Sequence, residues 1–239
     1  MKRFLHNSQK TRNSFEGGVD YSYNSIGHAN ISIIGCGGAG NNTIDRLMKI
    51  GISGARCIAL NTDLQHLNSI EAHEKLLIGK ELTRGLGAGG LPEIGKAAAE
   101  ESHQDINGML QDSDLIFITC GLGGGTGTGS VPIVAEIAKN TGSIVVAVIS
   151  LPFEAEKGRM KKAKEGLRNL RKYVDTLVVI DNNRLLQIAA DLPIGEAFSL
   201  ADEVLATMVK GITETISLPS LINLDYADIR TVLSSGGVA

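Results

Sequence analysis

The stretch Gly121-Leu122-Gly123-Gly124-Gly125-Thr126-Gly127-Thr128-Gly129-Ser130 decides how the rest of the chain is interpreted. The apolar run at residues 115–120 before it has the character of a strand, and residues 131–138 after it are apolar at helical spacing. We expect that helix to carry Pro132 in its first turn, where proline is tolerated. A strand, a glycine-rich loop and a helix start can wrap a phosphate, because glycine lets backbone N–H groups approach an anion closely. The stretch therefore predicts an anion-binding loop.

The composition is that of an ordinary globular protein. The chain has 239 residues, of which 43% are hydrophobic and 21% charged, so we expect one large domain, or one domain with appendages. A net charge of −3 without a basic block argues against a nucleic-acid partner. The longest apolar run, residues 144–149, is too short to span a bilayer, and the N-terminus does not resemble a signal peptide. These features favour a cytoplasmic protein that is not inserted in a membrane.

The chain divides into an irregular start and a regular remainder. Residues 1–28 are polar and lack periodicity, which predicts a mobile arm. From Asn30 onward, apolar strand segments alternate with helical patterns, which predicts an α/β fold with a Rossmann-like parallel sheet covered by helices on both faces. Strands are expected at residues 31–34, 56–60, 75–78, 115–120, 143–150 and 176–180. The three cysteines (Cys36, Cys57 and Cys120) lie at or near strands and are expected to be buried and to carry no chemistry.

The last long helix is expected from about Ile194 to Ser217. More than twenty residues make a helix about 30 Å long, which is enough to cross the whole domain. Pro219 ends the pattern. We therefore expect a nucleotide-binding domain at residues 29–193, the long helix at 194–218, and a loop with the start of a further helix at 219–239.

Three glycine patterns suggest different nucleotides. Residues 35–40 satisfy the dinucleotide fingerprint G-x-G-x-x-G, with Asp63 as the acidic residue further on, and alone they would suggest an NAD-binding oxidoreductase. Residues 90–97 superficially match a P-loop, but Ala97 stands where magnesium needs Ser or Thr. Two glycine-rich strand–loop–helix turns with a third glycine loop between them, at residues 85–90, suit a compact triphosphate with a magnesium ion better than a dinucleotide.

The string GGGTGTG at residues 123–129 resembles the signature of the tubulin/FtsZ GTPases. Other segments resemble FtsZ motifs and follow in the same order. These are GCGGAGNN at 35–42, NTD at 61–63, GAGG at 87–90, LPF at 151–153, ADEV at 201–204 and NLDYAD at 223–228. The resemblance covers roughly residues 30–239 and implies a domain that binds and hydrolyses GTP with Mg²⁺, in a protein that polymerises head to tail during cell division.

The resemblance also implies roles for individual residues in nucleotide binding. Asn182 and Asp202 would read guanine, since a carboxylate can accept hydrogen bonds from its N1–H and exocyclic amine together. Phe198 would lie against the base, Glu156 and Arg159 would contact sugar and phosphate, and Asp63 with Thr62 would lie near the water shell of the magnesium ion. The alternative for Asp63 is a helix N-cap. The residues implied in the phosphate loops are Gly37, Gly38, Asn42, Ala88, Gly89, Gly90, Gly124, Gly125, Thr126, Gly127 and Thr128.

The implied catalytic residues lie near the end of the chain. Asn223, Asp225 and Asp228 match FtsZ residues that reach the GTP of the neighbouring subunit and orient the attacking water. From the residues alone, the two carboxylates would be a helix cap and a charge favoured by the helix dipole. The family continues into a second domain and a tail that binds division-machinery adaptors, and this chain stops where that domain would begin. A non-catalytic GTP-binding assembly fragment therefore stays open, and an NAD-binding oxidoreductase is the remaining alternative.

Overall fold

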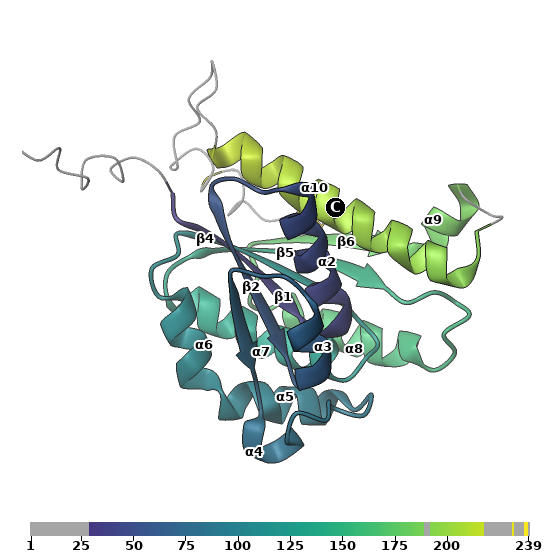
Figure 1. Ribbon diagram of the computed structural model, residues 1–239, viewed down its shortest axis with the longest axis horizontal. Helices are drawn as coiled ribbons and strands as arrows, with labels where there is room; N and C mark the ends of the chain where they lie inside the picture. Colours follow the sequence, from purple (N-terminus) through teal and green to yellow (C-terminus); the bar gives the residue numbers. More distant parts are fainter. Residues whose placement is uncertain (1–28, 189–191, 218–230, 232–236, 239) are drawn as a thin grey trace, which may run out of the picture.

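The structure is a computed structural model that describes residues 29–188, 192–217, 231 and 237–238. A parallel sheet forms its centre (Figure 1). The seven strands of this sheet follow in the order β3-β2-β1-β4-β5-β6-β7. The predicted α/β class with a parallel sheet is confirmed. The strands are β1 (Ile31–Cys36), β2 (Ala55–Asn61), β3 (Glu74–Leu77), β4 (Leu115–Gly121), β5 (Ile144–Leu151), β6 (Thr176–Asp181) and the short β7 (Gly237–Val238), which the sequence did not lead us to expect.

Helices lie on both faces of this sheet. In chain order they are α2 (Gly37–Ile50), α3 (Leu64–Ser69), α4 (Lys80–Thr83), α5 (Pro92–Glu101), α6 (His103–Leu110), α7 (Thr126–Asn140), α8 (Arg159–Leu170), α9 (Asn182–Ile188) and α10 (Ile194–Ser217). No helix in these described ranges is long and apolar enough to cross a membrane.

The two helical layers bury alternate residues of each strand. In β4, Ile116 and Ile118 pack with α5, α6, α7 and α8, whereas Leu115 and Phe117 pack with α2, α3 and α10. All four side chains are completely buried. Because successive strand residues point to opposite faces, burial of both faces requires continuous apolar runs. This is why the central strands are readily recognised in the sequence.

The order of the strands reverses between β1 and β4. From β1 the chain adds β2 and β3 on one side, and it then returns to add β4, β5 and β6 on the other. The carboxyl ends of β1 and β4 are neighbours, as the pairing of Gly35 with Thr119 shows. The helices that follow them, α2 and α7, pack on opposite faces of the sheet. A crevice opens at such a reversal point in parallel sheets, and ligands commonly bind there.

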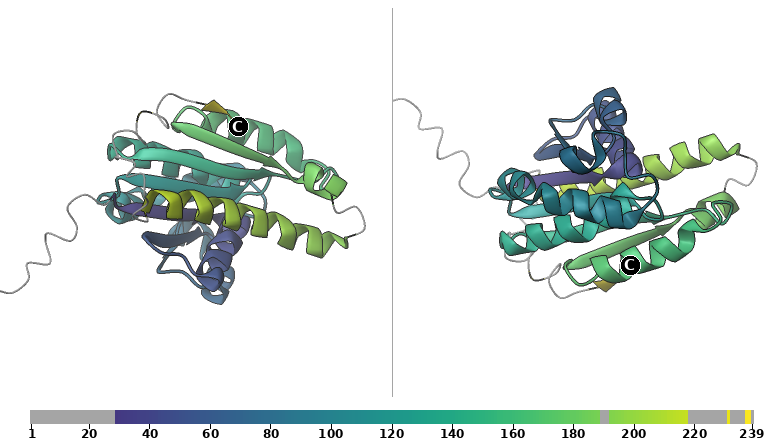
Figure 2. Two further views of the ribbon diagram at one scale, coloured as in Figure 1. Left: turned by 90° about the horizontal axis from the view of Figure 1, so that it is seen from above. Right: turned by 90° about the horizontal axis from the view of Figure 1, so that it is seen from below.

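The long helix α10 runs beside α2 across one face of the sheet (Figure 2). An ion pair of 2.6 Å joins Arg46 of α2 to Glu203 of α10, and Lys210 further along α10 donates to the carbonyl of Ile50, 3.1 Å away at the end of α2. Since α2 starts at the crevice, α10 also begins beside the crevice and extends away from it. The predicted long helix is confirmed over its 24 residues.

Three helix boundaries differ from our expectation. α7 begins at Thr126, so that Pro132 lies inside the helix instead of in its first turn. The early start accompanies a very close approach of α5, because a Cβ on Gly129 would collide with the carbonyl oxygen of Pro92. The first glycine turn is short, with α2 beginning at Gly37 directly after β1. The apolar spacing over residues 94–109 predicts a single helix after Pro92, whereas the structure has two, α5 and α6. The chain bends at Ser102, whose hydroxyl accepts from the N–H of Gly79 at 3.0 Å.

Candidate nucleotide-binding site

A cavity of about 250 Å³ lies at the crevice between β1 and β4. Its walls come from the start of α2, the glycine loop after β4, the segment after β5, and the starts of α8, α9 and α10. The predicted site residues that line it are Gly38, Gly124, Gly125, Thr126, Gly127, Glu156, Arg159, Asn182, Phe198 and Asp202. The fold thus brings together residues that are up to 164 positions apart, from Gly38 to Asp202.

The two glycine turns lie against each other at the floor of this cavity. Gly37 has a φ of +71°, and a Cβ on it would lie 2.6 Å from the backbone nitrogen of Gly127. Only glycine combines that conformation with so close an approach. Gly38 and Gly124 also line the cavity, and a Cβ on either would have no neighbouring atom within 4 Å. Their empty surroundings leave room for a ligand against the backbone of both turns, as the anion-binding prediction requires.

The third glycine loop, residues 85–91, contacts the glycine loop after β4. A Cβ on Gly125 would lie 2.8 Å from the backbone nitrogen of Leu91 and 2.9 Å from the Cβ of Ala88. Gly89 and Gly90 both have positive φ angles, of +59° and +74°. Ala88, Gly89 and Gly90 do not line the cavity itself but lie directly behind one of its walls. Lys162 of α8 donates to the carbonyl of Gly90 at 2.7 Å and so ties this loop to a third element.

Thr62 and Asp63 connect the third loop to the cavity without lining it. Thr62 is completely buried, its carbonyl accepts from the N–H of Gly87 at 3.0 Å, and its hydroxyl lies 2.6 Å from that of Thr126. The carboxylate of Asp63 accepts from the N–H of His66 at 3.0 Å, which makes it the N-cap of α3. The N-cap alternative for Asp63 is therefore present in the structure. This cap occupies one carboxylate oxygen and leaves the magnesium role a prediction.

Asp202, Asn182 and Phe198 line the cavity from α9 and α10. The side-chain oxygen of Asn182 is buried and has no hydrogen-bond partner among the described residues. A buried polar atom without a partner costs free energy, so it marks a place where a ligand donor fits. Phe198 is 40% exposed, and its ring packs edge to face with that of buried Phe153, at a centroid distance of 5.0 Å. An aromatic ring held in this way at a cavity can lie against a flat base.

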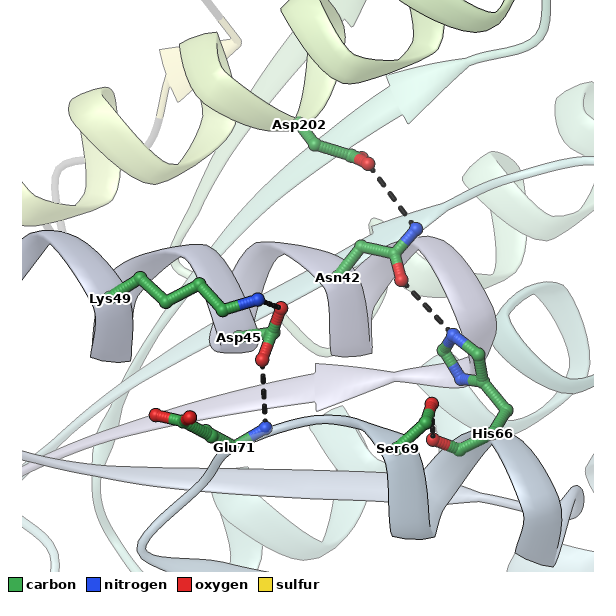
Figure 3. Close-up of polar contacts among 7 residues, drawn as sticks. All are labelled: Asn42, Asp45, Lys49, His66, Ser69, Glu71 and Asp202. Carbon is green, nitrogen blue, oxygen red and sulfur yellow. Dashed lines mark hydrogen bonds and ion pairs between the residues drawn. The ribbon is translucent and has the colours of Figure 1, made fainter.

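The carboxylate of Asp202 has unusual electrostatics. Burial raises its pKa from the ordinary value of 3.8 to about 6, against the lowering effects of a hydrogen bond from Asn42 and of the charge on Arg46. The Asn42 amide nitrogen lies 3.3 Å from the Asp202 Oδ2 atom (Figure 3). Asn42 therefore reaches the site through Asp202 and does not line the cavity itself. A desolvated carboxylate of this kind favours ligand N–H donors, because they restore the interactions lost with water.

Glu156 and Arg159 are paired at the mouth of the cavity. An Arg159 nitrogen lies 2.5 Å from the Glu156 Oε2 atom, and the other oxygen of Glu156 accepts from the N–H of Phe153 at 3.0 Å. Arg159 is the first residue of α8 and is exposed, so its guanidinium can turn toward an anion in the cavity. This pair supplies the cavity with a carboxylate held at both oxygens and with an exposed positive charge.

Several predicted residues lie elsewhere. Thr128 is in α7, its hydroxyl accepts from the N–H of Gly123 at 2.8 Å, and it lines a separate hollow of about 630 Å³ between α5, α7 and α8. Thr128 thus holds the glycine loop after β4 through its hydrogen bond from Gly123. The three cysteines are free and buried, which confirms their predicted burial, and desolvation raises the pKa of the Cys57 thiol to about 12. Asn223, Asp225 and Asp228 lie outside the described residues, as do residues 1–28.

Sequence reasoning missed three polar residues beside the site. Asn61 accepts the N–H groups of Thr62 and Asp63 through its side-chain oxygen, at 2.9 and 3.3 Å. Asn41 is completely buried and, in the amide orientation that its neighbours require, donates to the carbonyl of Gly35 at 2.9 Å and accepts from Asn61 at 2.9 Å. His66 lies between Asn61 and Asn42. Asn41 and Asn61 lie inside the motifs at residues 35–42 and 61–63, but a polar residue type alone assigns neither a contact, and His66 lies in none of the motifs.

The fold and the site together define an α/β nucleotide-binding protein with its ligand crevice at the reversal point of a parallel sheet. The family described as "Tubulin/FtsZ family, GTPase domain" matches residues 30–190. The chain belongs to this family, and the resemblance inferred from the glycine-rich motifs is confirmed.

Individual relatives agree with this assignment. The chain is 58% identical over 219 residues to cell division protein FtsZ 2 of Methanocaldococcus jannaschii, covering 92% of this chain and 58% of that protein. It is 54% identical to cell division protein FtsZ 2 of Haloferax volcanii, covering 97% of this chain and 57% of the relative. A solved structure titled "FtsZ dimer, empty (M. jannaschii)" superposes with a TM-score of 0.87 at 55% identity, over 91% of this chain and 64% of the other. The chain therefore spans about three-fifths of the length of these relatives.

Proposed function

We propose that this chain binds GTP in the crevice and hydrolyses it, as the GTPase part of an FtsZ-type cell-division protein that assembles head to tail. The observation that carries the proposal is the cavity itself, which combines two open glycine turns with a desolvated carboxylate and an unpartnered buried amide oxygen. The two glycine turns suit a polyphosphate, and the carboxylate of Asp202 with the amide oxygen of Asn182 suits the donor groups of guanine.

Base choice rests on hydrogen-bond polarity. Asp202 can accept from both the N1–H and the exocyclic amine of guanine, whereas adenine presents a lone pair at N1 that a carboxylate repels. The oxygen of Asn182 offers a further acceptor. Phe198 would lie against the face of the base, and Glu156 with Arg159 would contact the sugar and a phosphate. Asp63 would bind the water shell of a magnesium ion, which would neutralise charge on the phosphates during phosphoryl transfer.

Catalysis would be completed by a neighbouring subunit. Asn223, Asp225 and Asp228 follow α10, which begins beside the cavity and extends away from it along α2. A 24-residue helix is about 36 Å long, so the segment that carries these three residues follows the end of α10 that is remote from the crevice. In a head-to-tail stack they would reach the GTP of the next subunit and orient the attacking water. Adaptor proteins of the division machinery would bind parts of the full-length protein beyond this chain.

Turnover measured against protein concentration tests this proposal. If two molecules build one active site, phosphate release per molecule rises with total protein concentration, and it falls toward zero on dilution. A constant activity per molecule would contradict the shared site. GTP binding without turnover at any concentration would instead favour the second candidate, a non-catalytic GTP-binding assembly fragment. This candidate is tested because the chain covers only 58% of the length of its FtsZ 2 relative.

A further inference from the structure

A chain of hydrogen bonds joins the proposed base-reading carboxylate to the segment after β2. The amide nitrogen of Asn42 contacts Asp202 Oδ2 at 3.3 Å, and the amide oxygen of Asn42 lies 3.1 Å from His66 Nε2 (Figure 3). On the other side of the imidazole ring, His66 Nδ1 lies 3.2 Å from the side-chain nitrogen of Asn61. The three elements involved are α10, α2 and α3, together with the end of β2.

The donors and acceptors in this chain are fixed from both ends. The oxygen of Asn61 accepts two backbone N–H groups, so its nitrogen faces His66 and must donate to Nδ1. At the other end, the Asp202 carboxylate accepts from the nitrogen of Asn42, so the oxygen of Asn42 faces His66 and must accept from Nε2. The tautomer of His66 that satisfies both neighbours carries its proton on Nε2.

The backbone of His66 is held as well. Its N–H donates to the Asp63 carboxylate at the start of α3, and the residue is partly buried. Asn42, in contrast, is exposed, and its amide would be free to rotate without the contact from His66. If it rotated by half a turn, its oxygen would face the Asp202 carboxylate, and two acceptors would oppose each other.

We propose that His66 is a positioning residue for base recognition, which holds the Asn42 amide with its nitrogen toward Asp202 and thereby fixes the carboxylate for guanine. This inference rests on the proposed role of Asp202. His66 does not line the cavity, and we propose no contact between it and the nucleotide. We expect His66 to affect selectivity for guanine over bases that lack one of its two donors. The reason is that a carboxylate held through one oxygen presents its remaining acceptors to those donors in a single orientation.

The test compares GTP with inosine triphosphate, which lacks the exocyclic amine, by titration calorimetry on the full 239-residue chain. His66→Ala is expected to lower the ratio of GTP to ITP affinity by about 3- to 10-fold, the size of one lost hydrogen bond. His66→Gln is expected to restore most of the ratio, since its side-chain NH₂ can donate to the Asn42 oxygen. His103→Ala, an exposed histidine at the start of α6, is the matched control and should leave the ratio unchanged. An equal loss of GTP and ITP affinity in His66→Ala, or no loss in a folded protein, overturns the inference.

Two further measurements keep the outcomes distinct. Asp202→Asn should collapse the GTP to ITP ratio. If the ratio stays unchanged in Asp202→Asn, the proposed contact between Asp202 and the base is wrong. If the ratio collapses in Asp202→Asn but stays unchanged in His66→Ala, only the proposed role of His66 is wrong. Should His66→Ala fail to fold, the tautomer can still be read from ¹⁵N spectra of histidine-labelled wild type, with His66→Gln assigning the signal. A proton on Nε2 supports the inference, and a proton on Nδ1 overturns it.

Discussion

The hydroxyl groups of Thr62 and Thr126 lie 2.6 Å apart, although the two residues are separated by 64 positions. Thr62 follows β2 and Thr126 is the first residue of α7, so this contact joins the end of β2 to the start of the helix that follows the glycine loop after β4. Because the Thr62 carbonyl also accepts from Gly87 at 3.0 Å, one buried residue ties together three of the segments around the crevice.

Removing one of these hydroxyls should destabilise the protein. Thr126→Val keeps the shape of the side chain but leaves the buried Thr62 hydroxyl without its partner, at a cost of about 1–2 kcal/mol in the free energy of unfolding. Thr62→Val should cost a similar amount, and the double variant should cost less than the sum by about 1 kcal/mol, because the contact is lost only once. Denaturant unfolding measures all three. The exposed Thr207 of α10, changed to Val, serves as the control, and strict additivity would show that the contact contributes nothing.

Two adjacent glycines should respond differently to the same substitution. Gly124→Val places its side chain in the open cavity, so the protein should fold normally and lose GTP affinity by about 10- to 100-fold. Gly125→Val drives its side chain into Ala88 and Leu91, so it should lower the melting temperature as well. Thermal unfolding and GTP titration separate the two effects, with Gly108→Ala, at an exposed position of α6, as a control that should leave GTP affinity unchanged. Full GTP affinity in Gly124→Val would place the phosphates elsewhere.

Replacing Asp202 should stabilise the protein without nucleotide in a pH-dependent way. The folded-state pKa of Asp202 is about 6, above its ordinary value of 3.8, so the folded protein binds the proton more tightly than the unfolded chain. The ionised carboxylate therefore destabilises the fold fully above about pH 6, and the penalty fades as the pH falls toward 4. Asp202→Asn should gain about 1–3 kcal/mol at pH 7.5 and little at pH 4. A gain in unfolding free energy that is equal at both pH values would show that burial of charge is not its cause.

Mixing two inactive variants tests whether one active site is built from two molecules. Asp225→Ala should bind GTP but offer no catalytic carboxylate, and Gly124→Val should offer the carboxylate but bind GTP weakly. Each alone should be nearly inactive, and their mixture should recover phosphate release that rises with total protein. The experiment is best made with a chain extended to the full length of the FtsZ relatives, which this sequence covers only in part. A folded mixture that stays inactive while wild type turns over would contradict the placement of Asp225.

The sequence predicts the fold better than it predicts helix boundaries. Strands such as Leu115–Gly121 are buried on both faces, and burial leaves an apolar run that is local in the sequence. The start of α7 at Thr126 could not be predicted, because glycines are weak helix formers and the helix there depends on close packing with Pro92. The break between α5 and α6 likewise depends on a contact of Ser102 with Gly79, 23 positions away.

The candidate site divides in the same way. Its glycine loops are visible in the sequence because several glycines occur together next to strand and helix patterns. The proposed contact with the base is not, since Asp202 alone is indistinguishable from a solvated helix charge, and only the family resemblance assigned it a role. His66 escaped notice because its partners, Asn42 and Asn61, meet it only in the folded protein.

Recognition of guanine by the crevice can be measured by titrating the wild-type chain with GTP and with ATP in the presence of Mg²⁺. Calorimetry should show one GTP per chain, with ATP bound at least about tenfold more weakly, because adenine cannot donate to Asp202. The same titration on Asp202→Ala should narrow the gap between the two nucleotides. Equal affinities of wild type for GTP and ATP, or an unchanged ratio in the variant, would contradict the central claim that this crevice is built to recognise guanine.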